Sequence, residues 1–274
     1  MVLDAVGIAS EVTNIDGRWR INVADEAREP ALNELKSYQE ERQEDLKPKP
    51  PPVRVFGGAV AGVVGYLACE LLIASVSNSA ESRPIWLGIG RADATAIAEG
   101  QWWRCATALT LHADAGHLLS NLGYGSVFGF LVGRILGGGI GWLAIFVGGC
   151  AGNLLNNLMR NGDHLSIGAS TAVFAALGIL VAHALKPRSS NRQTAFQRWR
   201  PLIAGLILLS LTGIGGENTD VGAHAMGFFA GFVLGWIACR IPDDWLASTQ
   251  VQIASGSAAV TMLVTAWALA IATA

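Results

Sequence analysis

Four polar residues lie within otherwise apolar stretches of the chain, and their types are suited to the hydrolysis of a peptide bond. Ser170 lies in the run IGASTAVF and His224 in VGAHAMG, while His117 and Asn121 begin a third apolar run. A serine hydroxyl becomes a good nucleophile when a neighbouring base takes its proton, and histidine does this near neutral pH. The oxyanion formed on attack needs hydrogen-bond donors. We expect a Ser170–His224 dyad, with an oxyanion hole formed by His117, Asn121 and the backbone N–H of Ser170.

The composition of the chain indicates a membrane protein. Of its 274 residues, 51% are hydrophobic and only 15% are charged, whereas a soluble domain carries about a quarter charged residues. Most of the charge lies in the first fifty residues and in short connections. The net charge of −2 provides no broad basic surface, so nucleic acid is not an expected partner. The expected surroundings are the lipid bilayer.

Seven apolar stretches come near the length of about 20 residues that a helix needs to cross a bilayer. They lie at residues 55–76, 118–136, 139–159, 167–185, 201–216, 221–239 and 251–273. This pattern predicts an all-α polytopic membrane protein. A long connection from Ser77 to Leu111 separates the first two spans and contains Trp102 and Trp103, whose side chains favour the membrane–water interface.

The chain divides by composition into three parts. Residues 1–53 are polar, with a predicted helix from Pro30 to Leu46 and a stiff, proline-rich linker from Lys47 to Pro52. Residues 54–241 contain the first six spans, and residues 242–274 contain the seventh. We therefore expect a cytoplasmic amino-terminal segment, a six-helix core and an additional carboxyl-terminal transmembrane helix.

Basic residues predict the orientation in the membrane. The connection at 186–200 carries five basic residues and no acidic one, and such loops stay on the cytoplasmic side. The amino terminus is then cytoplasmic, and seven spans place the carboxyl terminus outside. We expect a multi-pass protein of a bacterial inner membrane.

The alternation of the spans brings the polar residues to one level. Spans two, four and six all enter from the outer face, and His117, Ser170 and His224 lie in their first turns. Because a helix rises about 1.5 Å per residue, the depths of these side chains agree to within a turn or two. Gly227 and Gly231 belong to a ridge of small residues on span six, which allows span four to approach closely.

Four short motifs follow one another between Arg54 and Arg240. They are WR at 103–104, HxxxxHxxxN at 112–121, GAS at 168–170 and AHxxGxxxG at 223–231. Their order and their places at helix starts resemble the rhomboid family of intramembrane serine proteases. The resemblance implies the same dyad and oxyanion donors, a six-helix core, a water-filled cavity open to the outer face, and transmembrane helices as substrates. It also implies supporting roles for Gly168, Phe174, Gly227 and Gly231.

Two positions depart from the pattern of that family. Thr171 follows the expected nucleophile where glycine is common, and its β-branch is expected to narrow the oxyanion site. Phe174 stands where tyrosine is common, so it can stack on His224 but has no hydroxyl to donate. Both dyad residues are present, which favours a protease over a catalytically silent relative that binds membrane-protein clients.

Other functions fit the polar residues less well. A channel would need a polar path to the cytoplasmic side, but below Ser170 the span is apolar until His183. His112, Asp114 and His117 are of types that ligate zinc, but no HExxH helix accompanies them. We therefore expect no metal and no cofactor.

Several polar residues near the expected site have simpler predicted roles. Glu70 lies near the outer end of the first span, where it can reach water or the first loop. His164 is expected to be solvated. Asp220, one turn before His224, is expected in a loop, which leaves a dyad rather than a triad. Residues 213–222, rich in glycine and polar residues, are expected to form a mobile gate. No motif indicates the substrate or the oligomeric state.

Overall fold

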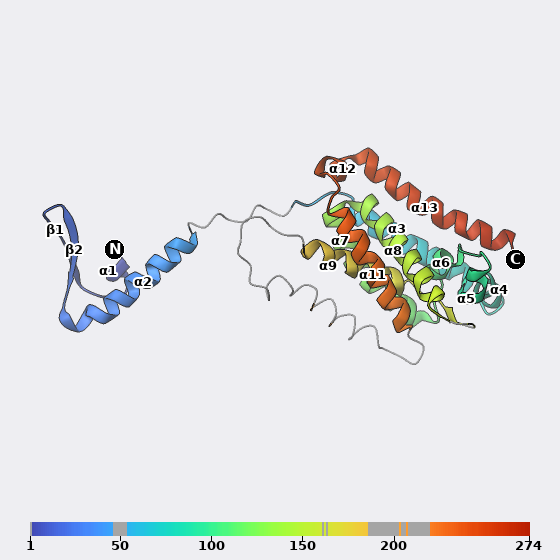
Figure 1. The fold of residues 1–274 in the computed structure, drawn as a ribbon, viewed down its shortest axis with the longest axis horizontal. Helices are drawn as coiled ribbons and strands as arrows, with labels where there is room; N and C mark the ends of the chain where they lie inside the picture. Colours follow the sequence, from blue (N-terminus) through green and yellow to red (C-terminus); the bar gives the residue numbers. More distant parts are fainter. Residues whose placement is uncertain are drawn as a thin grey trace. The chain divides into compact units, whose positions relative to one another are not determined.

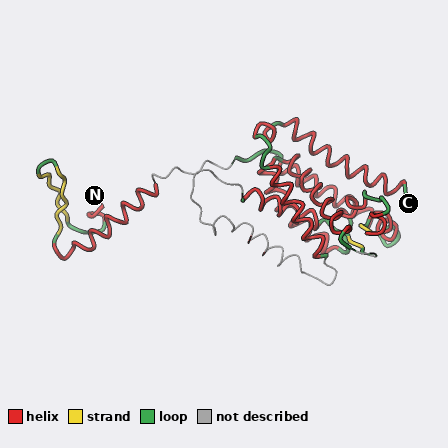
Figure 2. The backbone as a smooth tube through the Cα atoms, viewed as in Figure 1, coloured by secondary structure: helices red, strands yellow, loops and turns green. Residues whose placement is uncertain are grey.

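The computed structural model describes residues 2–45, 54–160, 162, 164–185, 203, 207 and 220–274. The chain forms two compact units, Met1–Pro52 and Val53–Ala274, whose elements are drawn in Figures 1 and 2. Three predictions fall outside the described residues. They are the linker at 47–52, the basic loop at 186–200 and the fifth span at 201–216, of which only residues 203 and 207 are described. The expected gate at 213–222 is described only from residue 220 onward.

The amino-terminal unit combines helices with a β-hairpin. Its elements are α1 (Val2–Ala5), β1 (Ser10–Ile15), β2 (Arg18–Val23), a short 3-10 helix (Asp25–Ala27) and α2 (Arg28–Asp45). The strands pair antiparallel through the turn at Asp16 and Gly17, whose φ angles of 55° and 75° are those that a tight two-residue hairpin requires. Helix α2 covers the predicted helix as far as Asp45.

The prediction of an all-α chain is wrong at two places. The first is the hairpin, whose signal was the alternation of Val12, Trp19 and Ile21 around an Asp-Gly turn. The second is a short antiparallel pair between β3 (Ala92–Asp93) and β4 (Leu165–Ser166). Local sequence does not predict this second pair, because it joins the first connection to the segment just before Ser170.

The second unit is a helical bundle. Its helices are α3 (Ala59–Ser77), α4 (Arg83–Gly90), α5 (Ala94–Ala98), α6 (Arg104–Thr107), the 3-10 helix η2 (Ala108–Thr110), α7 (Ala115–Leu136), α8 (Gly138–Leu158), α9 (Ser170–Ala184), α11 (Val221–Ala238), α12 (Asp243–Ala247) and α13 (Thr249–Ala272). Helices α4 to η2 fold the first connection into a compact cap at one end of the bundle (Figure 1).

Four of the described helices, α3, α8, α11 and α13, are long and apolar enough to cross a bilayer. The chain is therefore a multi-pass membrane protein. Helix α9 is apolar but has only 15 residues. Helix α7 has 22 residues and is not among these four helices. Its first turns carry the polar side chains of His117, Ser120 and Asn121.

Helices α9 and α11 touch along their backbones. A methyl group added to Gly231 would lie 2.0 Å from the carbonyl oxygen of Ala175, and one added to Gly178 would lie 2.2 Å from that of Phe228. No side chain fits in such a space, so both helices need glycine there. This close contact places the amino-terminal turns of α9 and α11 beside each other.

Candidate active site

Ser170 and His224 meet between two helices. Ser170 is the first residue of α9, and His224 lies in the first turn of α11. Its ring nitrogen Nε2 lies 2.9 Å from Ser170 Oγ, a hydrogen-bond distance. The ring of Phe174, one turn along α9, packs on the imidazole with 4.4 Å between the ring centroids. The geometry allows a proton to pass from the hydroxyl to the imidazole.

Gly168 makes room for His117 beside the serine. Its φ of +126° lies in a region that favours glycine. An added methyl group would lie 2.7 Å from His117 Nε2 and 3.7 Å from Ser170 Oγ. His117 Nδ1 accepts a hydrogen bond of 3.3 Å from the backbone N–H of Ala113. In a neutral ring the proton is then on Nε2, so His117 has a donor next to Gly168, in the wall of the cavity that Ser170 also lines.

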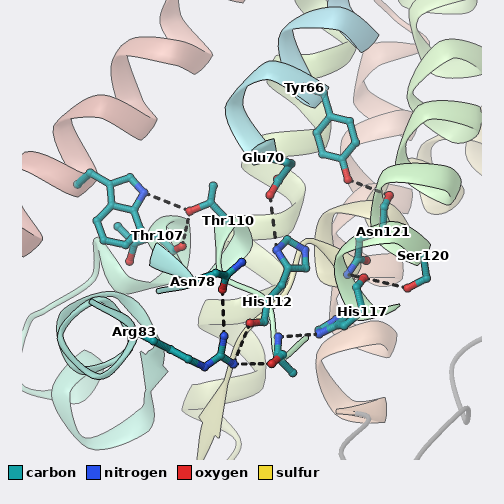
Figure 3. A network of polar contacts seen from close by, with 12 residues as sticks. Tyr66, Glu70, Asn78, Arg83, Thr107, Thr110, His112, His117, Ser120 and Asn121 are labelled. Atoms are coloured by element: carbon teal, nitrogen blue, oxygen red, sulfur yellow. Dashed lines mark hydrogen bonds and ion pairs between the residues drawn. The ribbon is translucent and has the colours of Figure 1, made fainter. Parts of the chain in front are cut away.

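Asn121 lies one turn beyond His117 on α7. It is buried, and its amide nitrogen donates to the carbonyl oxygen of His117 at 3.0 Å. The backbone carbonyl of Asn121 accepts from the hydroxyl of Tyr66 on α3 at 2.8 Å (Figure 3). The amide nitrogen carries a second hydrogen, and Asn121 borders the same cavity as the dyad. The side chain therefore has a second hydrogen that it can donate at the wall of this cavity.

A cavity of about 1190 Å³ gives access to these groups. Ser170, His224, His117 and Asn121 all line it. The structure thus gathers the predicted dyad and both predicted side-chain donors around one space large enough for several residues of an extended peptide.

Asp220 anchors the start of α11. One carboxylate oxygen accepts from the backbone N–H of Ala223 at 3.0 Å, and the other contacts His164 Nε2 and the amide nitrogen of Asn156, both at 2.7 Å. Burial opposes ionisation, but these hydrogen bonds outweigh it and hold the pKa of Asp220 below its usual range. One oxygen thus caps α11, and the other joins it to α8 and to the segment before Ser170.

This network was not predicted. His164 was expected to be solvated, but its side chain is only 21% exposed and pairs with Asp220. Its partner lies 56 positions away, so no local pattern reveals the contact. The only local signal was the position of Asp220 immediately before an apolar helix, which is typical of an N-cap.

Thr171 occupies a groove between helices. It is buried, and its methyl carbon Cγ2 would lie 2.8 Å from a methyl group added to Gly152 and 2.9 Å from one added to Gly227. The methyl group thus packs against α8 and α11, where two glycines accommodate it. The methyl group of Thr171 therefore lies toward these two glycines. From the sequence we had expected it to narrow the oxyanion site.

The residues that were considered as zinc ligands make other contacts in the structure. Asp114 accepts from the backbone N–H of His117 at 2.8 Å and caps α7. His112 is buried, and its Nδ1 lies 3.9 Å from a carboxylate oxygen of Glu70, as Figure 3 shows. Burial, and to a smaller degree the nearby His117 ring, lowers the pKa of His112 to about 4. Among the described residues, no three His, Cys, Asp or Glu side chains are grouped as a metal site requires.

The first connection carries the remaining motif. Arg104 donates to the carbonyl oxygens of Gly88 and Arg91 at 3.0 and 3.1 Å and to the side chain of Gln101 at 2.6 Å. It therefore fixes the fold of the connection and lies outside the set of residues that line the cavity.

The chain is similar to known proteins over this region. Residues 99–241 match the model of the Rhomboid domain. The chain is 29% identical to rhomboid protease GluP of Bacillus subtilis over 172 residues, which are 61% of the chain and 32% of that protein. It is 29% identical to the putative rhomboid protease YdcA of the same organism over 53% of the chain and 71% of the relative. It is 30% identical to RHOMBOID-like protein 7 of Arabidopsis thaliana over 57% of the chain and 49% of the relative.

Proposed function

Because the chain belongs to the rhomboid family, we propose that it is an intramembrane serine endopeptidase that cleaves transmembrane helices. The observation that carries this proposal is the 2.9 Å contact between Ser170 Oγ and His224 Nε2. A hydroxyl so placed can lose its proton to the imidazole as it attacks a carbonyl carbon. Relatives that are named as proteases support the same class of reaction.

Each polar side chain of the site has a role in the proposed reaction. Ser170 Oγ attacks the scissile carbonyl, and His224 takes its proton. The oxyanion receives hydrogen bonds from His117 Nε2, the Asn121 amide and the backbone N–H of Ser170. His224 then protonates the leaving amine, and a water molecule activated by the same ring hydrolyses the acyl enzyme. Ser170 is the first residue of α9, so the positive end of the helix dipole also favours the oxyanion.

The proposal includes an arrangement in the membrane. Residues 1–53 form a cytoplasmic segment, 54–241 a six-helix protease core and 242–274 an additional seventh helix. The cavity then opens toward the outer face of a bacterial inner membrane, and the substrate helix is cut near that face. The four helices suited to crossing a bilayer support the membrane location but leave the total number of spans as part of the proposal.

A reconstituted cleavage assay tests the proposal. Purified protein is placed in lipid vesicles with a panel of single-span substrates that carry a tag at each end. Wild-type protein should release tagged fragments cut within or next to the span, and Ser170→Ala and His224→Ala should release none. Fragment release that continues in Ser170→Ala would overturn the assignment of the nucleophile.

A further inference from the structure

The segment Ala108–Ala113 touches both sides of the candidate oxyanion site. Its first residue, Ala108, accepts a hydrogen bond of 2.9 Å from the backbone N–H of Gly168, two residues before the serine. Its last residue, Ala113, donates its N–H to His117 Nδ1 at 3.3 Å. A shift of this short segment would therefore move Gly168 and His117 relative to Ser170. We call it the linking segment.

The carboxyl-terminal helix α13 contacts the linking segment directly. The indole N–H of Trp267 donates to Thr110 Oγ1 at 3.2 Å, and both groups are buried. The Trp267 ring also packs with Leu111 in one apolar cluster, and Ile167, which directly precedes Gly168, packs against the same cluster. A single tryptophan thus contacts the middle of the linking segment, at Thr110 and Leu111.

The indole ring of Trp267 packs tightly against residues of α4. A methyl group added to Gly90 at the end of α4 would lie 2.5 Å from the ring carbon Cη2 of Trp267 and 3.0 Å from Leu111 Cδ1. Trp86 of the same helix meets the indole edge to face, with 4.8 Å between centroids. The ring is therefore held from the side of the first connection, and its position is fixed by shape as well as by its hydrogen bond.

The other end of α13 is held as firmly. The side-chain oxygen of Gln252 accepts from the backbone N–H groups of Gly139 and Ile140 at 2.8 and 3.0 Å. Its amide nitrogen donates to the carbonyl oxygens of Leu136 and Leu246 at 3.0 and 2.9 Å. Helix α13 is thus fixed at the turn between α7 and α8. Because the start of the helix is fixed, the position of Trp267 near its end is fixed as well. Figure 1 shows α13 running along the bundle to the cap formed by α4, α5 and α6.

Two further contacts complete the support of the linking segment. Arg83 of α4 donates to the carbonyl oxygens of His112 and Ala113, and Glu70 of α3 faces the ring of His112. Figure 3 shows Arg83, Glu70, Thr110 and His112 around this part of the chain. These residues hold the end of the segment near His117, whereas Trp267 of α13 contacts its middle at Thr110 and Leu111.

We infer that α13 is a positioning element for catalysis, in which Trp267 holds the linking segment so that His117 and the Gly168–Ser170 backbone stay aligned for the oxyanion. This inference rests on the proposed protease function. Neither Trp267 nor Thr110 lines the cavity of the candidate site, so both act through the residues that they hold. Their loss should weaken binding of the transition state more than binding of the substrate, so kcat should fall while KM stays the same.

The test compares Trp267→Phe, Thr110→Val and the double variant with two controls. Trp267→Phe keeps a ring but removes the N–H, and Thr110→Val removes the accepting oxygen. Trp236→Phe is the matched control on α11, because Trp236 is 43% exposed and does not belong to the Trp267 cluster. Thr110→Ser keeps the hydroxyl and should restore wild-type behaviour. Gly90→Ala adds a methyl group that would displace the Trp267 ring from the side of α4.

Two readouts separate the positioning role from the protease function. In kinetic assays, Trp267→Phe and Thr110→Val should lower kcat about three- to tenfold without changing KM, as expected for one lost hydrogen bond. Gly90→Ala should also lower kcat without changing KM, because its methyl group displaces the indole ring. The double variant should lose no more than the larger single effect, because both changes break the same contact. Amide hydrogen exchange of the peptide covering 108–117 should be faster in the same variants and unchanged in Trp236→Phe and Thr110→Ser.

Each result decides the inference. Unchanged exchange at 108–117 in both single variants would show that α13 does not hold the segment. Faster exchange with unchanged kcat would show that holding it does not matter for catalysis. If wild-type protein cleaves no substrate, the proposed function fails, and the exchange measurement alone then decides whether α13 braces the segment.

Discussion

The two halves of the candidate site are held in place by different means. The dyad half is built on α9 and α11, whose backbones touch through Gly178 and Gly231. The oxyanion half is built on the first connection and the start of α7, and it is held by side-chain contacts from α3, α4 and α13. A methyl group added to Gly178 or Gly231 in the first half would meet backbone atoms, whereas one added to Gly90 beside the second half would meet side chains, which can adjust by small movements.

This difference predicts how each half responds to change. A larger side chain between α9 and α11 must separate two backbones, so it should disturb the fold and the dyad together. A substitution around the linking segment changes the alignment of donors and should reduce rate while the bundle stays folded. The following variants test that contrast.

The largest effect is expected from Gly231→Leu. Its side chain has no space beside the carbonyl oxygen of Ala175, which would lie 2.0 Å from an added methyl group, so α9 and α11 must part. A displacement of about 1 Å at a catalytic group can cost about 100-fold in rate, and overpacking costs a further 1–3 kcal/mol or so of stability. Cleavage should fall below detection, and thermal melting in detergent should shift downward.

Gly123→Leu is the matched control for that variant. Gly123 lies on α7, and no heavy atom lies within 4 Å of a methyl group added there. It should melt and cleave like the wild type. Equal behaviour of the two variants would remove the distinction between the tight half and the rest of the bundle.

Asn121→Ala should produce the next largest effect. One hydrogen of the amide nitrogen bonds the carbonyl oxygen of His117 within α7, and the other is proposed to donate to the oxyanion. Loss of one such oxyanion donor costs about 2.7–4 kcal/mol of transition-state stabilisation. Turnover should therefore fall about 100- to 1000-fold while the melting temperature changes little, measured by cleavage assay and by melting of the same preparation. An unchanged turnover would exclude Asn121 from the site.

Acidification should act on the oxyanion half through His112. Since its folded pKa of about 4 lies below the ordinary value near 6.5, the unfolded chain binds a proton first as the pH falls. Stability is then full above about pH 6.5 and is lost progressively down to pH 4. Through this group the wild-type protein should lose about 2 kcal/mol of its free energy of unfolding between pH 7 and pH 5, and His112→Gln should not show this loss. Melting curves at the two pH values measure it, and equal losses in both proteins would contradict the buried, neutral state of His112.

The smallest effect is expected from Thr171→Ser. This change removes the methyl group that packs against Gly152 and Gly227 and keeps the hydroxyl. Stability should fall by about 1 kcal/mol for one buried methyl group, and turnover should stay near the wild-type value. A several-fold rise in turnover would mean that the methyl group does narrow the oxyanion site.

Much of the bundle could be predicted from sequence because its signals are local. The stretch at 139–159 corresponds to α8 (Gly138–Leu158), and that at 221–239 to α11 (Val221–Ala238). Ser170 and His224 each lie at a helix start, as predicted from apolar patterning. The alternation of spans that led us to expect them at one level stays a prediction, as do their proposed roles, and the structure adds that they lie 2.9 Å apart.

The support of the oxyanion half could not be predicted in the same way. Trp267 and Thr110 are 157 positions apart, and each is an ordinary residue in its own segment. His164 was expected to be a solvated loop residue, because its partner Asp220 is 56 positions away in the sequence. Contacts of this kind depend on how the first connection folds against α8 and α13, and hydropathy along the chain carries no information about that packing.

The most direct test of the account is the rate at which a fluorophosphonate probe labels the purified protein in detergent. The probe reacts only with an activated serine, so wild-type protein should be labelled, Ser170→Ala should not, and His224→Ala should react far more slowly because the hydroxyl has lost its base. Labelling that persists in Ser170→Ala, or that is as fast in His224→Ala as in the wild type, would contradict the claim that these two side chains share a proton.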